Sequence, residues 1–286
     1  MWNSRAAKAG RRRDGLSRRV KLLPLIIAGL VVGATRMSEA APAGPEVAVP
    51  ARTAPKPPAL LPDLTPLRAK DMAIEMTERH RRLRFTAGLA NIGRGALEVR
   101  PDNRRRCGRA ERHASQVIYR DVDGDGRFIR NQDTIQTLRS AGCMIFHPRH
   151  AHWHFEAASR YRVYRPDREQ DSIVRSRKVS FCLRDSERVP NRFGTFNKPL
   201  YYDGCSRDTP QGISTGWVDV YASYLAGQAL PLPNRLPNGV YCLAIQLDPL
   251  DELWESDESN NESSRAFRLY GERVEPVKPN DCTSPE

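Results

Sequence analysis

Short apolar segments separated by turn residues run along most of this chain. Each segment alternates apolar and polar residues, as in a half-buried β-strand, and is bounded by Pro, Gly, Asn or Asp. The 22 Pro residues outnumber the 19 Gly residues, which indicates many turns and few long helices. The pattern predicts an all-β fold, a single antiparallel β-sandwich with long loops. The segments are SQVIYR (115–120), RYRVYR (160–165), VSFCLRD (179–185), GVYCLAIQLDP (239–249) and RAFRLY (265–270).

Three further stretches need separate interpretation. Residues 83–100 alternate around a Gly-containing turn. Residues 67–82 are the best helix candidate, although the same residues are compatible with a strand that leads into the sheet. Residues 121–127 (DVDGDGR) resemble the start of an EF-hand calcium loop, but position twelve is Gln132 instead of Glu and no helix pair flanks the loop. We therefore expect a polar hairpin turn at residues 121–127.

The N-terminal segment has the features of an export signal. In residues 1–41, basic residues precede an apolar run of 13 residues (22–34), and small residues follow it. The run is shorter than the ~20 residues that span a bilayer, so we expect cleavage and no stable membrane insertion afterwards. SRRVKL (17–22) resembles a twin-arginine signal, but Lys21 replaces the usual Phe, which leaves ordinary secretion and twin-arginine export both open. The predicted location is secreted, periplasmic or on the cell surface.

Composition divides the rest of the chain into a linker and one domain. Residues 42–59 are rich in Pro and Ala and predict an extended linker, and residues 60–286 form the predicted domain. The net charge of +12 suggests a nucleic-acid partner until it is divided by position. Residues 1–41 hold nine of the 46 Lys and Arg and two of the 34 Asp and Glu, so residues 42–286 carry only +5. We therefore expect no nucleic-acid partner.

The six cysteines all follow the predicted leader. An even number of cysteines in an exported chain predicts three disulfides, and the absence of CxxC argues against a zinc knuckle or a thioredoxin-like pair. Six cysteines allow 15 pairings. Short loops suit a compact β domain, which favours Cys107–Cys143, Cys182–Cys205 and Cys242–Cys282.

Four of the six histidines lie within eight residues, in HPRHAHWHFE (147–156). On a strand, His150, His152 and His154 project from one face. The outer two Cα atoms of a straight strand are ~13 Å apart, so the three rings can share an ion only where the strand bends. Imidazole ligands suit Cu(II), Zn or Ni better than Ca or Mg. The segment predicts a transition-metal site.

The histidine segment and five other strings together resemble the lysyl oxidase family. They occur in the order and at about the spacings of that family, and the likeness covers residues ~60–270. The chain resembles an exported, bacterial-type member with only the catalytic domain. The strings are HPRHAHWHF (147–155), RKVSFCLRDS (177–186), QGISTGWVDVY (211–221), GQ (227–228), NGVYCLAIQLDP (238–249) and ESDESNN (255–261).

The resemblance implies a copper-dependent amine oxidase with a lysine tyrosylquinone cofactor made from its own chain. By position, His150, His152 and His154 resemble the copper ligands. Lys178 resembles the cross-linking lysine and Tyr221 the tyrosine that becomes the quinone. His147 resembles an additional histidine upstream of the ligands, which we expect to support them without binding the metal.

The same resemblance implies a calcium site. Its ligands are oxygens from carboxylates, amides and one backbone carbonyl, which suit this hard ion. The alternative for this stretch is an ordinary polar turn after a strand. The implied ligands are Asp63, the Leu64 carbonyl, Glu255, Asp257, Asn260 and Asn261.

The chain departs from the animal enzymes at two places. Arg149 stands where those enzymes carry a Cys, and ALPLP (229–233) replaces their aromatic and acidic residues after Gly227-Gln228. These departures argue against this chain acting on the extracellular-matrix substrates of the animal enzymes, but they remove none of the implied ligands. We expect ALPLP to reshape that strand.

Three functions follow from these features. The leading one is oxidative deamination of a primary amine, on peptidyl lysine or a small amine, to an aldehyde with release of ammonia and hydrogen peroxide. The sequence does not identify the general base; Asp219 qualifies only if its strand is regular and points it to the side of Tyr221. The alternatives are a non-catalytic exported copper-binding β-domain and adhesion to a polyanion through the residual charge.

Overall fold

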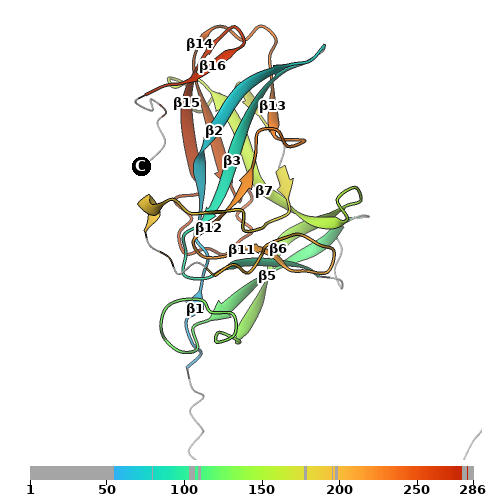
Figure 1. Cartoon of the computed structure of the whole chain (residues 1–286), viewed down its shortest axis with the longest axis vertical. Helices are drawn as coiled ribbons and strands as arrows, with labels where there is room; N and C mark the ends of the chain where they lie inside the picture. The colour runs from blue at the N-terminus through green and yellow to red at the C-terminus, as the bar shows by residue number, and fades with distance from the viewer. Residues whose placement is uncertain are drawn as a thin grey trace, which may run out of the picture. The chain divides into compact units, whose positions relative to one another are not determined.

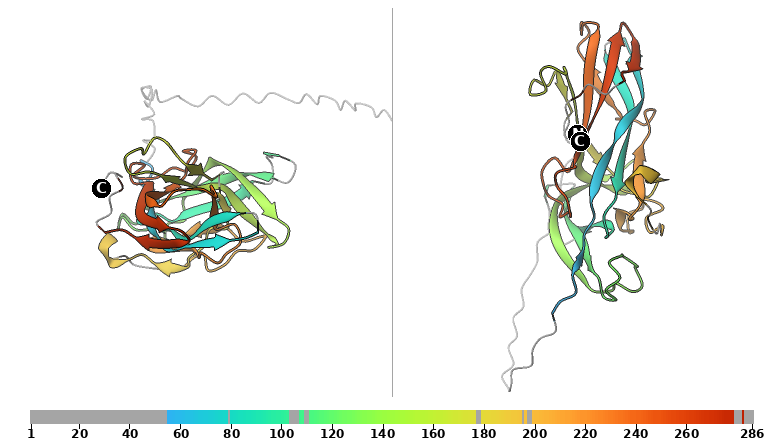
Figure 2. Two further views of the ribbon diagram at one scale, coloured as in Figure 1. Left: turned by 90° about the horizontal axis from the view of Figure 1, so that it is seen from above. Right: turned by 90° about the vertical axis from the view of Figure 1, so that its left-hand side faces the viewer.

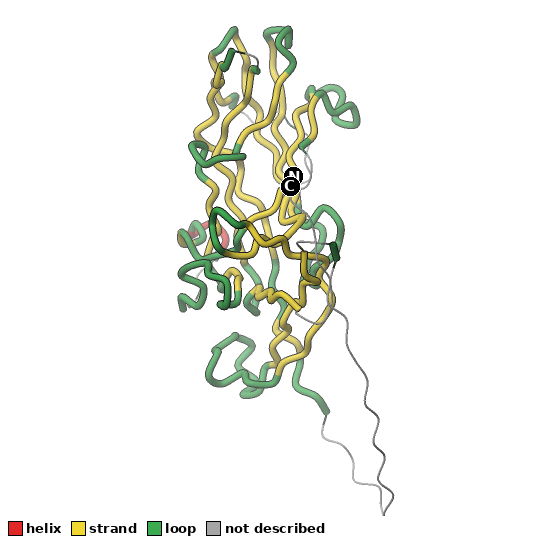
Figure 3. The backbone as a smooth tube through the Cα atoms, turned by 90° about the vertical axis from the view of Figure 1, so that its right-hand side faces the viewer, coloured by secondary structure: helices red, strands yellow, loops and turns green. Residues whose placement is uncertain are grey.

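Alternating burial along the chain produces strands that pair in two antiparallel sheets. The computed structural model describes residues 55–78, 80–102, 107–108, 111–176, 179–194, 196, 199–278 and 282. They belong to one unit, Ala54–Glu286. The predicted leader 1–41 and residues 42–54 of the predicted linker lie outside the described residues. Apart from one short 3-10 turn, the described chain consists of strands and loops (Figure 3).

The described residues form an 11-stranded and a 5-stranded sheet, here called the large and the small sheet. The large sheet has the order β11-β4-β5-β6-β7-β14-β15-β16, with β1 on β5 and with β8 and β9 on β7. The strands of the large sheet are β1 (Ala59–Leu60), β4 (Leu97–Asp102), β5 (Glu111–Arg120), β6 (Gln136–His147), β7 (His152–Tyr164), β8 (Val174–Arg175), β9 (Val179–Phe181), β11 (Gln211–Ile213), β14 (Gly239–Leu247), β15 (Glu262–Tyr270) and β16 (Arg273–Pro276).

The small sheet has the order β10-β12-β3-β13, with β2 also paired to β3. Its strands are β2 (Leu64–Met76), β3 (Arg81–Asn91), β10 (Glu187–Arg188), β12 (Trp217–Tyr221) and β13 (Ala229–Leu232). The 3-10 turn η1 (Asn191–Phe193) follows β10. Figures 1 and 2 show β2 and β3 crossing the face of β7, β14 and β15.

The main core lies between the two sheets. Phe85 of β3, Tyr161 of β7 and Phe267 of β15 are all nearly inaccessible to solvent, and the Phe85 and Tyr161 rings meet edge to face at 4.8 Å. Burial of such side chains is the main favourable contribution to folding. The all-β sandwich expected from the sequence is confirmed.

The helix candidate at residues 67–82 is wrong, and the strand alternative is correct. Leu67 and Ala69 are buried while Arg68 between them and Lys70 after them are exposed, which is the period-two burial of a strand. Register shifts between Leu67 and Lys70 and between Lys70 and Ala73 blur this alternation in the sequence.

The turn within residues 83–100 connects the two sheets, since β3 belongs to the small sheet and β4 to the large one. Gly93 and Gly95 in this turn lie against the backbone of residues 60–63, which leaves no room for a side chain. The segment ALPLP, which stands in place of the aromatic and acidic residues of the animal enzymes, forms β13 with its first four residues. This strand lies at the edge of the small sheet, where a Pro is tolerated.

The expected hairpin at residues 121–127 is present, because β5 and β6 pair antiparallel on either side of it. All three favoured disulfides are formed: Cys107–Cys143, Cys182–Cys205 and Cys242–Cys282. Within the described residues, no helix is long and apolar enough to cross a bilayer.

Candidate functional site

The histidine cluster lies at the turn between β6 and β7, here called the histidine turn (residues 147–154). His147 ends β6 and pairs with His152, which begins β7. The backbone N–H groups of His150 and Ala151 donate to the His147 carbonyl, and Ala151 has a φ of 55°. The expectation that all three candidate ligands lie on one strand is wrong for His150. Its position in the turn supplies the bend that a shared ion requires.

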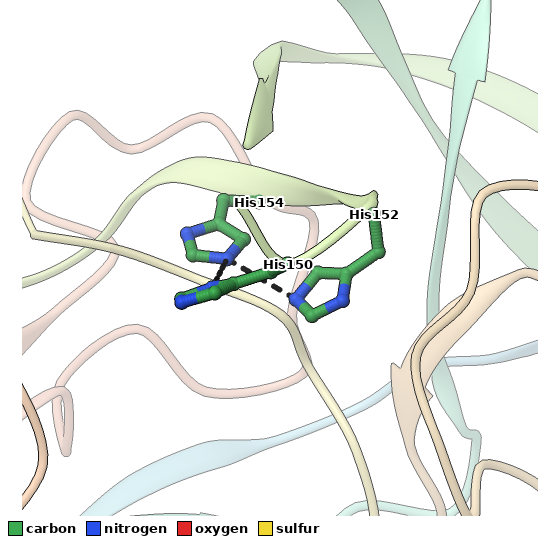
Figure 4. Close-up of side chains that lie close together, drawn as sticks. All are labelled: His150, His152 and His154. Carbon is green, nitrogen blue, oxygen red and sulfur yellow. Dashed lines mark hydrogen bonds between the residues drawn. The ribbon is translucent and has the colours of Figure 1, made fainter. Parts of the chain in front are cut away.

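The three rings converge on one point (Figure 4). His154 Nε2 lies 3.2 Å from His150 Nδ1 and 3.2 Å from His152 Nε2. Two nitrogens bound to one ion at ~2.0–2.1 Å, with bond angles near those of square-planar or tetrahedral sites, lie about 2.9–3.4 Å apart. The spacing of the nitrogens therefore fits a single transition-metal ion.

Partial burial favours the neutral form of two of these rings, His152 and His154. It lowers the pKa of His154 to about 4, with further lowering from His152, His147 and His150. Burial also lowers the pKa of His152, and His150 adds to that effect. Neutral imidazole is the form that binds a metal, so at neutral pH no proton has to leave these two rings first.

His147 packs against this cluster. Its ring stacks on His150 at 3.9 Å and on His154 at 4.9 Å between centroids. Its Nδ1 is buried without a hydrogen-bond partner among the described residues. The contacts fit the supporting position expected for His147, because they hold two of the three candidate ligands in place.

Cys182 lies between the histidine turn and Tyr221. A ring nitrogen of His152 lies within 4.8 Å of the Cys182 and Cys205 sulfurs, which form a disulfide. The hydroxyl of Tyr221 donates to the Cys182 carbonyl at 2.6 Å. One residue therefore lies near the candidate metal site and also contacts the candidate cofactor tyrosine.

Tyr221 ends β12, whose pairing with β3 is regular from Val218 to Tyr221. Because the strand is regular, Asp219 lies on the same face, and its Oδ2 lies 2.8 Å from the Tyr221 hydroxyl. The Tyr221 ring stacks on Phe181 of β9, with centroids 3.4 Å apart. The condition under which Asp219 qualifies as a base is met.

The buried setting shifts the protonation of both residues. Burial raises the pKa of Asp219 to about 7, against the lowering effect of the Tyr221 hydrogen bond and of Arg184. Burial and the Asp219 charge raise the pKa of Tyr221 well above its ordinary value. Lys178 lies outside the described residues. Its neighbour Val179 pairs with Ser159 of β7.

The residues implied for calcium lie near one another in a second cluster, here called the acid–amide cluster (Asp63, Leu64, Glu255, Asp257, Glu258, Asn260 and Asn261). The Leu64 N–H donates to Glu255 Oε2 at 2.6 Å, and Asn260 Nδ2 donates to Asp63 Oδ1 at 2.8 Å. Asn261 Nδ2 donates to Glu258 Oε2 at 2.9 Å. The sequence analysis did not identify Glu258, although it lies within the quoted string ESDESNN.

Two features of the acid–amide cluster suit a cation. The amide oxygens of Asn260 and Asn261 are buried and have no hydrogen-bond partner among the described residues. Burial raises the pKa of Glu255 to about 9, and Glu258 and Asp248 raise it further. Burial and the nearby Asp257 also raise the pKa of Asp63. A bound cation would supply the missing partner for the amide oxygens and stabilise the ionised carboxylates.

A third group of oxygens, from Asp121, Asp123 and Asp125, lies within 4.8 Å in the β5–β6 hairpin. Asp121 accepts from the N–H groups of Gly124 and Gly126, and Asp125 accepts from that of Arg127. These bonds explain the cluster as a loop held by its own aspartates.

Comparison with known proteins identifies related chains. The family model described as Lysyl oxidase matches residues 125–279, more than half of the chain. Lysyl oxidase homolog 2 of Homo sapiens is 30% identical over 131 residues, covering 46% of this chain and 16% of the relative. Lysyl oxidase homolog 2 of Gallus gallus is 28% identical over 131 residues, which again cover 46% of this chain and 16% of the relative. The Mus musculus protein is 28% identical over 189 residues, covering 62% of this chain and 23% of the relative. The matched segments thus span less than a quarter of these relatives.

Proposed function

The chain belongs to the lysyl oxidase family, and we propose that it is a copper- and quinone-dependent amine oxidase. It would convert a primary amine, dioxygen and water into an aldehyde, ammonia and hydrogen peroxide. The substrate is a peptidyl lysine or a small amine. The observation that carries the proposal is the convergence of three histidine nitrogens at 3.2 Å, beside a cysteine that also contacts Tyr221.

Each site residue has a proposed role. His150, His152 and His154 hold Cu(II), and His147 keeps two of their rings in place by stacking. Tyr221 and Lys178 form the lysine tyrosylquinone. When present, these two groups supply a two-electron oxidation of the amine with dioxygen as the final acceptor. Phe181 holds the Tyr221 ring by stacking, and Asp219 and the Cys182 carbonyl fix its oxygen.

We assign a structural role to calcium. Asp63, the Leu64 carbonyl, Glu255, Asp257, Asn260 and Asn261 would bind the ion. Leu64 begins β2 of the small sheet and Asp63 directly precedes it, whereas residues 255–261 lead into β15 of the large sheet. A calcium ion in the acid–amide cluster would therefore connect the two sheets without taking part in the oxidation.

The proposed location is outside the cytoplasm. Three disulfides and family membership both support an oxidising, extracellular setting. In this proposal residues 1–41 direct export, residues 42–59 form a linker, and residues 60–286 form the catalytic domain.

The test is an amine-oxidase assay on the copper-reconstituted chain. We expect hydrogen peroxide release on addition of primary amines, and none from the Tyr221→Phe variant, which cannot form the quinone. Peptide mapping should recover Lys178 and Tyr221 in one cross-linked peptide. A non-catalytic copper-binding domain would take up copper, release no peroxide and yield the two peptides separately and unmodified.

A further inference from the structure

Two acceptor oxygens lie within hydrogen-bond distance of the Tyr221 hydroxyl, which has only one proton to donate. The Tyr221 hydroxyl lies 2.6 Å from the Cys182 carbonyl oxygen and 2.8 Å from Asp219 Oδ2. A phenol has one proton, and a carbonyl oxygen can only accept. Both contacts are full hydrogen bonds only when a second proton is present, and Asp219 is the group that can carry it.

The surroundings of Asp219 favour that second proton. Asp219 is 1% exposed, its Oδ1 accepts a long hydrogen bond of 3.4 Å from the Ser186 hydroxyl, and the backbone N–H of Arg184 also donates to its carboxyl group. In the part of the chain that the structure describes, the titratable groups that act on it are Tyr221 from its own strand, Arg184 from the segment after β9, and Tyr161 from β7. Among the described residues no cation forms a close ion pair with Asp219, and a buried carboxyl in such a setting is more stable as the neutral acid, in agreement with a pKa raised to about 7.

We propose that Asp219 is the acid–base residue that gives a proton to the Tyr221 oxygen, and takes one from it, whenever that oxygen changes between hydroxyl and carbonyl. This inference rests on the proposed function, because only an oxidised Tyr221 has a carbonyl at this position. A protonated Asp219 would donate to a carbonyl there, which accepts and cannot donate. The same pair of side chains therefore matches both states of the ring oxygen.

The step balances as a proton transfer coupled to the proposed oxidation. Oxidation of the reduced ring would remove two electrons and two protons from it. The O–H bond of Tyr221 would break and an O–H bond would form on the ionised Asp219 Oδ2, while the second proton of the ring leaves to solvent. Dioxygen would take up the two electrons, with two protons from solvent, and become hydrogen peroxide. Reduction by the amine would return two electrons to the ring, with one proton from Asp219 and one from the amine, whose other proton goes to solvent. Over one cycle Asp219 neither gains nor loses a proton.

The first measurement needs no metal and no activity. Infrared difference spectra between the wild type and Asp219→Asn, both copper-free and full length, report the carbonyl stretch of a protonated Asp219 carboxyl. We expect this band at about pH 5 and its loss by about pH 9. A spectrum without the band at about pH 5 shows an ionised Asp219 and overturns the proposal.

The second measurement follows the growth of quinone absorbance after copper and air are added. The wild-type rate should rise with pH through about 7, because the ionised carboxylate is the base. Asp219→Asn should be about 100-fold slower or more and independent of pH in this range, with unchanged copper uptake. Asp219→Glu should restore the pH dependence. Asp203→Asn, which removes an equal charge at an exposed position, should match the wild type.

The outcomes separate the two hypotheses. If Asp219→Asn forms quinone at the wild-type rate with the wild-type pH profile, Asp219 has no acid–base role although the oxidase assignment stands. If the wild type forms no quinone, the oxidase assignment fails and this role fails with it. Should Asp219→Asn not fold by circular dichroism, Ser186→Ala decides the question: loss of its hydrogen bond should move the rate profile to higher pH, and an unmoved profile contradicts the proposal.

Discussion

The histidine turn and the acid–amide cluster are built in opposite ways. The three candidate copper ligands lie within five positions of one β-hairpin, so local backbone geometry suffices to bring their nitrogens together. The acid–amide cluster joins Leu64 to Glu255 and Asp63 to Asn260, across 191 and 197 positions of sequence. Only the packing of the two sheets assembles it. The first site depends on a turn and the second on the whole fold.

The same physical cause gives the two regions opposite protonation chemistry. Burial disfavours charge, so it lowers the pKa of His154 to about 4 and raises that of Glu255 to about 9. At neutral pH the partly buried His154 imidazole is a free base that can bind a metal without releasing a proton. Glu255 is instead a neutral acid, so a cation that binds its carboxylate displaces a proton.

The largest expected effect is loss of copper from the histidine turn. His152→Ala should lower copper affinity by about 100-fold or more, more than the loss of a supporting hydrogen bond costs. Because His152 contributes little to the main core, the fold should persist, which circular dichroism can check. Metal analysis after dialysis measures the copper content, and Arg149→Ala in the same turn is the matched control. Full copper content in each single variant of His150, His152 and His154 would show that the ligand assignment is wrong.

The next effect is stabilisation by calcium. A ligand bound only by the folded state stabilises it by about 2.7 kcal/mol at about 100 times its Kd. For a domain of this size that shift corresponds to a rise of about 5–10 °C in Tm. Calcium titrated into chelator-treated protein, followed by thermal unfolding, measures the rise, and Glu255→Gln should abolish it. A Tm that does not respond to calcium would show that the acid–amide cluster is not a calcium site.

The third effect is the pH dependence of stability without metal. Because the pKa of Glu255 is higher in the folded state, the folded chain holds the extra proton, and stability falls as pH rises from about 4.5 to about 9. Glu255→Gln should weaken this fall, since glutamine stays neutral. Tm against pH for both proteins in chelator is the measurement. Parallel curves would mean that Glu255 ionises normally in the folded protein.

The smallest expected effect is a difference in metal binding between two isolated peptides. A synthetic peptide of residues 144–156 should bind Cu(II) weakly, because it contains all three imidazole ligands. A peptide of residues 252–263 should show no calcium binding, because it lacks Asp63 and Leu64. Isothermal titration of both peptides measures this difference. Calcium binding by the second peptide would contradict the view that the acid–amide cluster depends on the fold.

Strand alternation, the three disulfides and the region of the site could be predicted from local patterns. The helix candidate at residues 67–82 failed because two register shifts interrupt the alternation of β2. His150 was placed on a strand because periodicity alone does not show where β6 ends and the turn begins. A one-residue shift in such a boundary changes the direction of a side chain, which composition does not record.

The sequence by itself determined the all-β class, the even set of six cysteines that form three disulfides, and the concentration of imidazole side chains in residues 147–154. These features depend on residue type and on spacing over a few positions. Only the tertiary structure placed Asp219 and the Cys182 carbonyl on the Tyr221 oxygen and joined Asp63 to residues 255–261. Such contacts link strands from distant parts of the chain, and the burial that shifts their pKa values exists only after the sheets have packed.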